Sequence, residues 1–121
     1  MHDDKSSWVL LPHSSYLRDF RWYTKKRPAE LAAVLRNLDR TMTLLANSPH
    51  ARTIQAGFLH TEPHGMVALD QRGGGGRLQE TRLYGYAHAG SRTVHLLGIG
   101  DKSSQPADLT RLSPLARTLN S

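Results

Sequence analysis

The segment Glu80–His88 carries, at every second position, side chains of the types that bind RNA. Alternate side chains of a β-strand share one face, and this face would hold Arg82, Tyr84, Tyr86 and His88. A guanidinium grips phosphate oxygens in pairs, and aromatic rings stack on exposed bases. We therefore predict an RNA-binding face. The alternative is a solvated outer face that is polar only because the strand alternates.

Seven histidines are many for 121 residues, and histidine is the usual proton donor or acceptor near neutral pH. We predict His64 as the acid/base residue, because it stands at the start of an expected strand, where loops present reactive side chains. His95 lies within a later strand and alternates with Thr93 and Leu97, so it is equally interpreted as a buried, satisfied histidine. The pattern leaves open which histidine acts as base.

Two segments look like ligand-binding motifs but lack the required geometry. In His60–His64 the glutamate stands one position later than in the zinc-protease motif His-Glu-x-x-His, and Pro63 breaks the helix that this motif needs. The Gly73–Gly76 run is followed by no Lys-Ser/Thr pair, so we interpret it as a flexible hairpin loop rather than a phosphate loop. The chain has no cysteine. We expect no metal site and no cofactor.

Hydrophobic periodicity predicts the elements that position these side chains. A helix opened by Pro28 carries one apolar stripe, in which we expect Leu35, Leu38 and Met42 to be largely buried. The order β-α-α-β-β-β-α predicts an α+β fold, with an antiparallel meander in a three- or four-stranded mixed sheet and both N-terminal helices on one face. The expected elements span about 7–11, 15–27, 28–46, 65–70, 80–88, 92–98 and 105–119, and we expect an irregular connection at 50–64.

Composition and charge narrow the class of protein. The length fits one domain over 1–121, with tails at 1–6 and 119–121 that we expect to be disordered. No apolar run is long enough to span a bilayer, and the polar N-terminus lacks a signal-peptide core, so we expect a cytoplasmic protein. A net charge of +6 and a pI near 10.2 favour a polyanionic partner such as nucleic acid; the alternative is a charge that serves only solubility.

Three segments together resemble one family of small bacterial toxins. Val94–Leu109 contains the stretch Gly-x-Gly-Asp-Lys-x-x-Gln-x-x-Asp-Leu, which resembles the C-terminal part of HigB-type toxins in the RelE superfamily. His64–Leu69 and Thr81–Tyr86 are similar to two central strands of that family. At the level of element order the resemblance covers about residues 8–118. Two features depart from the family: Asp70 replaces its usual strand arginine, and the glycine run lengthens one hairpin.

The resemblance implies a toxin of a type II toxin-antitoxin module that cleaves messenger RNA on the ribosome without a metal. In such an endoribonuclease the ribose 2′-OH is the nucleophile, and a cognate antitoxin neutralises the enzyme. Arg82 matches the strand arginine of the family, Lys102 its second basic residue and Asp108 an aspartate of its C-terminal helix. The competing role of Asp108 is to complement the helix dipole. Arg72 and Arg77 flank the glycine loop and complete the predicted RNA-binding set.

Two other functions remain open at this point. The ParE branch of the same superfamily acts on DNA gyrase and cleaves no RNA, and a shared fold does not separate the two activities. The third possibility is a basic nucleic-acid-binding module without toxicity. The alternating face around Arg82 favours RNA, because a gyrase toxin would need no acid/base residue there.

Overall fold

Five strands form one mixed sheet in the computed structural model, which describes residues 7–47, 56–71 and 77–120. The strand order is β1-β5-β4-β3-β2. β3, β4 and β5 form the expected antiparallel meander, while β1 pairs with β5 in parallel and β2 pairs with β3 antiparallel. The α+β class is confirmed. The strands are β1 Val9–Pro12, β2 Leu59–Thr61, β3 Val67–Gln71, β4 Thr81–His88 and β5 Thr93–Asp101.

Both N-terminal helices contribute side chains to the same hydrophobic cluster. They are α1, Ser14–Lys26, and α2, Pro28–Ala46, with Pro28 in the first turn of α2. The apolar stripe of α2 is buried against side chains of β3, β4 and β5. Leu38 is buried, which confirms that expectation, whereas Leu35 and Met42 are half-buried and pack at the margin of the cluster.

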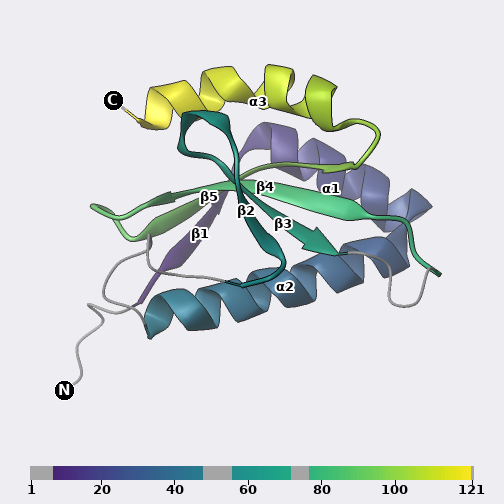
Figure 1. Ribbon diagram of the computed structural model, residues 1–121, viewed down its shortest axis with the longest axis horizontal. Helices are drawn as coiled ribbons and strands as arrows, with labels where there is room; N and C mark the ends of the chain where they lie inside the picture. The colour runs from purple at the N-terminus through teal and green to yellow at the C-terminus, as the bar shows by residue number, and fades with distance from the viewer. Residues whose placement is uncertain (1–6, 48–55, 72–76, 121) are drawn as a thin grey trace.

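The C-terminal helix covers the opposite face of the sheet. Helix α3, Gln105–Leu119, lies above the sheet in Figure 1 and α2 lies below it. Buried side chains of α3 and of the sheet form a second hydrophobic cluster, which comprises Met66, Ala68, Tyr84, Leu97, Leu112 and Ala116. The face that carries Arg82 and Tyr84 is therefore covered by a helix, and its interpretation as an open outer face is wrong.

The element order differs from the expected one between α2 and β3. We expected an irregular connection from 50 to 64, but its described part contains β2 and a one-turn 3-10 helix, η3, at Pro63–Gly65. His64 and Gly65 both adopt positive φ, 62° and 80°. That conformation turns the chain from β2 back into β3, and glycine adopts it without steric cost.

Residues 119 and 120 are ordered, because one belongs to α3 and the other is hydrogen-bonded. Leu119 is the last residue of α3, and Asn120 accepts a hydrogen bond from the Tyr86 hydroxyl at 2.6 Å. The Asn120 amide also donates to the His64 carbonyl at 2.6 Å. The expected tail is therefore wrong at 119 and 120. Among the described residues, no helix is both long and apolar enough to cross a bilayer.

Candidate active site

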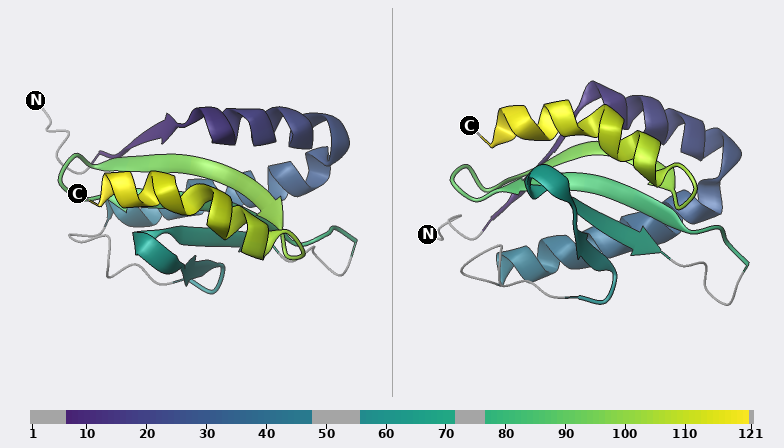
Figure 2. Two further views of the ribbon diagram at one scale, coloured as in Figure 1. Left: turned by 90° about the horizontal axis from the view of Figure 1, so that it is seen from above. Right: turned by 45° about the horizontal axis from the view of Figure 1, so that its top comes forward.

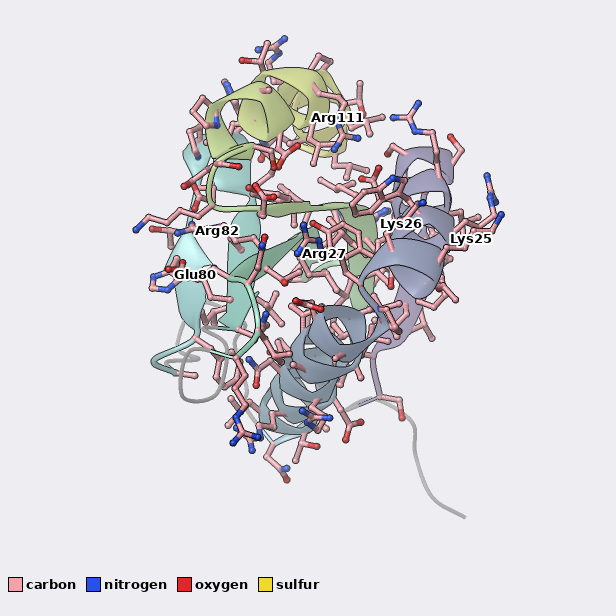
Figure 3. All side chains as sticks on the ribbon, turned by 90° about the vertical axis from the view of Figure 1, so that its right-hand side faces the viewer. Lys25, Lys26, Arg27, Glu80, Arg82 and Arg111 are labelled. Carbon is pink, nitrogen blue, oxygen red and sulfur yellow. The ribbon has the colours of Figure 1, made fainter. Side chains whose placement is uncertain are left out.

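Arg82 is held by two carboxylates between the sheet and the start of α3. It faces Asp70 directly across the β3–β4 pair. Its Nε lies 3.5 Å from Asp70 Oδ1, and its Nη1 lies 3.7 Å from Glu62 Oε2. The side chains of Arg82, Asp70 and Glu62 are 14%, 3% and 9% exposed. Figure 3 shows Arg82 beside Glu80 at this end of the molecule. Sequence alternation predicted an open arginine, but the structure gives a paired and largely buried one.

His60 adds an exposed imidazole to the same group. Its Nε2 lies 3.0 Å from Asp70 Oδ2, and its side chain is 37% exposed. The buried carboxylate lies within ion-pair distance of this ring nitrogen, so the two groups can interact directly. His60, Glu62, Asp70 and Arg82 are called the Arg82 cluster below. The sequence pattern at His60–His64 indicated only an incomplete zinc motif, so it did not identify His60 as a site residue.

The Arg82 cluster contains buried polar atoms that lack a hydrogen bond. Within the described residues, His60 Nε2, Asp70 Oδ1 and Arg82 Nε make no hydrogen bond of proper geometry, and neither does the buried Tyr84 hydroxyl. The ion-pair distances of 3.5 and 3.7 Å exceed those of good hydrogen bonds, which are roughly 2.7–3.2 Å. Buried polar groups are normally satisfied, so these atoms have hydrogen-bonding capacity for a ligand or for water.

Lys102 lies at the same end of the sheet but outside the cluster. Asp101, its neighbour, pairs with Thr81 across β4 and β5. The Lys102 ammonium lies 4.0 Å from Glu80 Oε1 and its side chain is 72% exposed. Such a surface ion pair contributes little stability and separates readily. Lys102 can therefore exchange this contact for a phosphate group that binds near Arg82.

Tyr84 is not available to stack on a base. Its side chain is fully buried under α3. Burial is the main cause that raises the pKa of the Tyr84 hydroxyl, and nearby Asp108 adds to it. The predicted stacking role of Tyr84 is therefore wrong, because α3 occupies the face that sequence alternation left open.

The remaining predicted RNA-binding residues are spread along the sheet. Tyr86 and His88 lie four and six residues beyond Arg82 on β4, which is roughly 13 and 20 Å along a strand. Tyr86 is half-buried against the turn at Gly65, and His88 pairs with Ser91 in the β4–β5 hairpin. Arg77 is exposed. Arg72 lies outside the described residues.

His64 lies on the same segment as two members of the Arg82 cluster. It follows Glu62 by two residues, so their Cα atoms are at most about 7 Å apart. Its side chain is exposed on η3. Along the chain His60 and His64 thus flank Glu62, and the His64 carbonyl is bound by Asn120, which also bonds Tyr86.

The GxGDKxxQxxD stretch forms the junction between β5 and α3. Asp101 Oδ1 accepts hydrogen bonds from the Ser104 amide at 2.8 Å and from the Ser103 hydroxyl at 2.7 Å, and these bonds lower the Asp101 pKa. Asp108 accepts from the Ser104 hydroxyl at 2.7 Å and from Arg111 at 3.3 Å. Burial nevertheless raises the Asp108 pKa. Both aspartates thus have structural partners.

No known family model, curated protein or solved structure matches this chain. No group of three or more histidine, aspartate or glutamate side chains in the described ranges is arranged to hold a metal ion. The chemistry that the Arg82 cluster can perform is proton transfer by His60 next to a cation.

Two further histidines, His13 and His95, form a pair, and His95 contacts Tyr86. His13 Nε2 and His95 Nδ1 lie 2.9 Å apart, and the ring of His95 meets that of Tyr86 edge-on at 6.5 Å. His95 is 9% exposed. Burial, followed by the nearby His13 and His88, lowers the His95 pKa. The interpretation of His95 as a buried histidine with a partner is confirmed.

The lowered His95 pKa predicts a loss of stability in mild acid. As the pH falls below about 6.5, the ordinary value for histidine, unfolded chains bind a proton at His95 while folded chains do not. The free energy of unfolding therefore falls until the pH passes the folded pKa. Urea melts at pH 7.5 and 5.5 should show a smaller decrease for His95→Gln than for the wild type. His64→Gln, at an exposed histidine, serves as control; an equal decrease in all three proteins would contradict the prediction.

Proposed function

We propose that this chain is a metal-independent endoribonuclease of the RelE/HigB toxin type. It cleaves messenger RNA, on the ribosome and in the cytoplasm, and a cognate antitoxin holds it inactive. The observation that carries the proposal is the proximity of three groups: His60 Nε2 lies 3.0 Å from the buried Asp70 carboxylate, which also contacts Arg82. The net charge of +6 supports a polyanionic substrate, because each neutralised phosphate releases a counterion.

The proposed reaction needs one base, one acid and a cation. The 2′-oxygen of the ribose attacks the adjacent phosphorus, the bond to the 5′-oxygen breaks, and a 2′,3′-cyclic phosphate forms. His60 takes the proton of the 2′-OH, and Asp70 stabilises the resulting imidazolium. His64 donates a proton to the leaving 5′-oxygen.

Arg82 and Lys102 stabilise the negative charge that develops on the phosphate oxygens. The contact of 3.7 Å between Arg82 Nη1 and Glu62 is long, so this guanidinium nitrogen could exchange it for a phosphate oxygen. Lys102 can exchange its contact with Glu80 for a phosphate. The site thus combines a fixed cation with a flexible one.

His60→Ala should abolish RNA cleavage. Removing a general base typically costs about 100- to 10,000-fold in rate. The measurement is cleavage of a 5′-labelled messenger RNA fragment with EDTA present, with and without ribosomes. Growth arrest after induction and mapping of messenger-RNA 5′ ends extend it to cells.

His88→Ala is the matched control, because His88 lies at the far end of β4. It should cleave within about twofold of the wild type, as expected for a residue outside the catalytic group. Circular dichroism checks that both variants are folded. A folded His60→Ala protein with the wild-type rate would rule out this mechanism.

A non-catalytic nucleic-acid-binding module, or a gyrase-directed toxin, is the second candidate. The observation that favours it is the pairing of Arg82 with two carboxylates, whose negative charges outnumber its single positive charge. Binding of a 2′-O-methyl RNA, which cannot be cleaved, together with no cleavage of ordinary RNA would support the module. Growth arrest without RNA cleavage would support the gyrase toxin.

A further inference from the structure

Exposed apolar side chains gather on one continuous part of the chain. Six large hydrophobic side chains are exposed among the described residues, and five of them lie between positions 9 and 22. Scattered exposed apolar residues are common, but a contiguous group marks an interaction site. The five are Val9 (58%), Leu10 (43%), Leu11 (47%), Leu17 (42%) and Trp22 (49%).

These side chains line one edge of the molecule. β1 is the outermost strand of the sheet. Figure 2, left, shows α1 continuing from the end of β1 along the same side. Four residues of strand and thirteen of helix give this edge a length of roughly 30 Å. A partner segment of ordinary size can lie along it.

The helical part of this edge is positively charged and carries no exposed acid. Its four cations are all exposed, and in the described part of the chain none forms an ion pair. Asp19 is the only acidic residue of α1, and it points inward to Arg111 and the Ile99 amide. Figure 3 shows Lys25 and Lys26 on α1, on the opposite side from Arg82. The cations are Arg18, Arg21, Lys25 and Lys26.

The geometry points to a binding site for an acidic, amphipathic segment of a partner protein. We call it the β1–α1 surface; it comprises the five apolar residues and the four cations. Apolar side chains of the partner would pack over Leu10, Leu17 and Trp22, and its carboxylates would pair with the cations. Tryptophan and arginine are the residue types that most often dominate binding energy in protein interfaces.

Other occupants fit this surface less well. Single-stranded RNA would use the cations and Trp22 but would leave the aliphatic side chains of β1 in water. A second copy of this chain, in a two-fold dimer, would set four cations against four cations. A β-strand added to β1 would gain little, because Pro12 has no N–H to donate.

The inference rests on the proposed function only where the partner is called an antitoxin. In that case the antitoxin would hold the toxin through α1, and the Arg82 cluster would not have to be covered. The surface itself is independent of any catalytic role.

The test uses fluorescence anisotropy with a synthetic amphipathic peptide of leucine and glutamate. Trp22→Ser and Arg21→Ser should each weaken peptide binding by about tenfold or more, as at an interface hot spot. The matched controls are Leu44→Ser and Arg36→Ser, which change one exposed apolar and one exposed basic residue on α2. They should change binding by less than about twofold.

Four outcomes would overturn the proposal. They are equal binding of a scrambled peptide of the same composition, tighter binding of a 2′-O-methyl RNA at these residues, preference for vesicles containing phosphatidylglycerol, and dimerisation that Trp22→Ser abolishes. Thermal melting checks that each variant is folded. RNA cleavage by the free Trp22→Ser protein should keep the wild-type rate. Peptide binding therefore tests the proposed surface, and RNA cleavage tests the proposed enzyme, independently of each other.

Discussion

Arg82→Ala should destabilise the fold by about 3 kcal/mol, the scale of loss when one partner of a buried ion pair is removed. The variant leaves Asp70 and Glu62, which are 3% and 9% exposed, without the cation that balances them. A buried charge without a partner is far more costly than a missing surface charge. In a protein of this size the melting temperature should fall by roughly 10 °C. Urea and thermal melts at pH 7 measure both quantities.

A double-mutant cycle identifies the cause of this loss. Asp70→Asn removes one of the unpaired carboxylates, so the Arg82→Ala, Asp70→Asn protein should lose less than the sum of the two single losses. Lys102→Ala is the control, because its exposed ion pair contributes about 1 kcal/mol at most. An Arg82→Ala protein that melts together with the wild type would show that the ion pairs contribute no net stability.

The expected loss of stability affects how a cleavage assay of Arg82→Ala is interpreted. Loss of RNA cleavage in Arg82→Ala cannot by itself assign a catalytic role, because the variant also loses stability. Arg82→Lys keeps the charge but not the planar fork. A folded Arg82→Lys protein with a much lower cleavage rate would assign the phosphate contact to the guanidinium.

Sequence periodicity predicted the fold better than the site. The stripe along α2 and the meander of β3, β4 and β5 follow from local patterns, because one face of each element must be buried. Alternation correctly placed Arg82 and Tyr84 on one face of β4. Which helix covers that face depends on α3, and no pattern within β4 contains that information.

The missed residue His60 has a similar explanation. His60 lies in the segment that we expected to be an irregular connection, and β2 has only three residues. So short a strand shows no periodicity by itself. The available signal was the alternation of His60 and Glu62, together with Asp70 in place of the arginine that the resemblance led us to expect. Pairing of β2 with β3 brings these acids to Arg82.

Among the glycines in the described part of the chain, Gly100 is the one whose substitution by alanine should lower the free energy of unfolding most. A Cβ at Gly100 would overlap the carboxylate of Asp108 and lie 2.7 Å from the Ser104 hydroxyl oxygen. Asp108 is buried and bound to Ser104 and Arg111, so it cannot move aside without losing both partners. Overpacking costs about 1–3 kcal/mol and a lost buried hydrogen bond about 1–3 more. We therefore expect a loss of about 3 kcal/mol or more by urea melts.

The cause of this loss of stability can be tested by removing the Asp108 carboxylate, which the added methyl group would overlap. The Gly100→Ala, Asp108→Ala protein should be more stable than the sum of the two single losses predicts, because the clash with the carboxylate is gone. Gly57→Ala is the matched control, since nothing lies within 4 Å of a Cβ at that position. A Gly100→Ala protein as stable as Gly57→Ala would mean that α3 packs less closely on β5 than the structure shows. A loss confined to Gly100→Ala would instead explain the glycine in the GxGDKxxQxxD stretch by close helix-to-strand packing, without any role in catalysis.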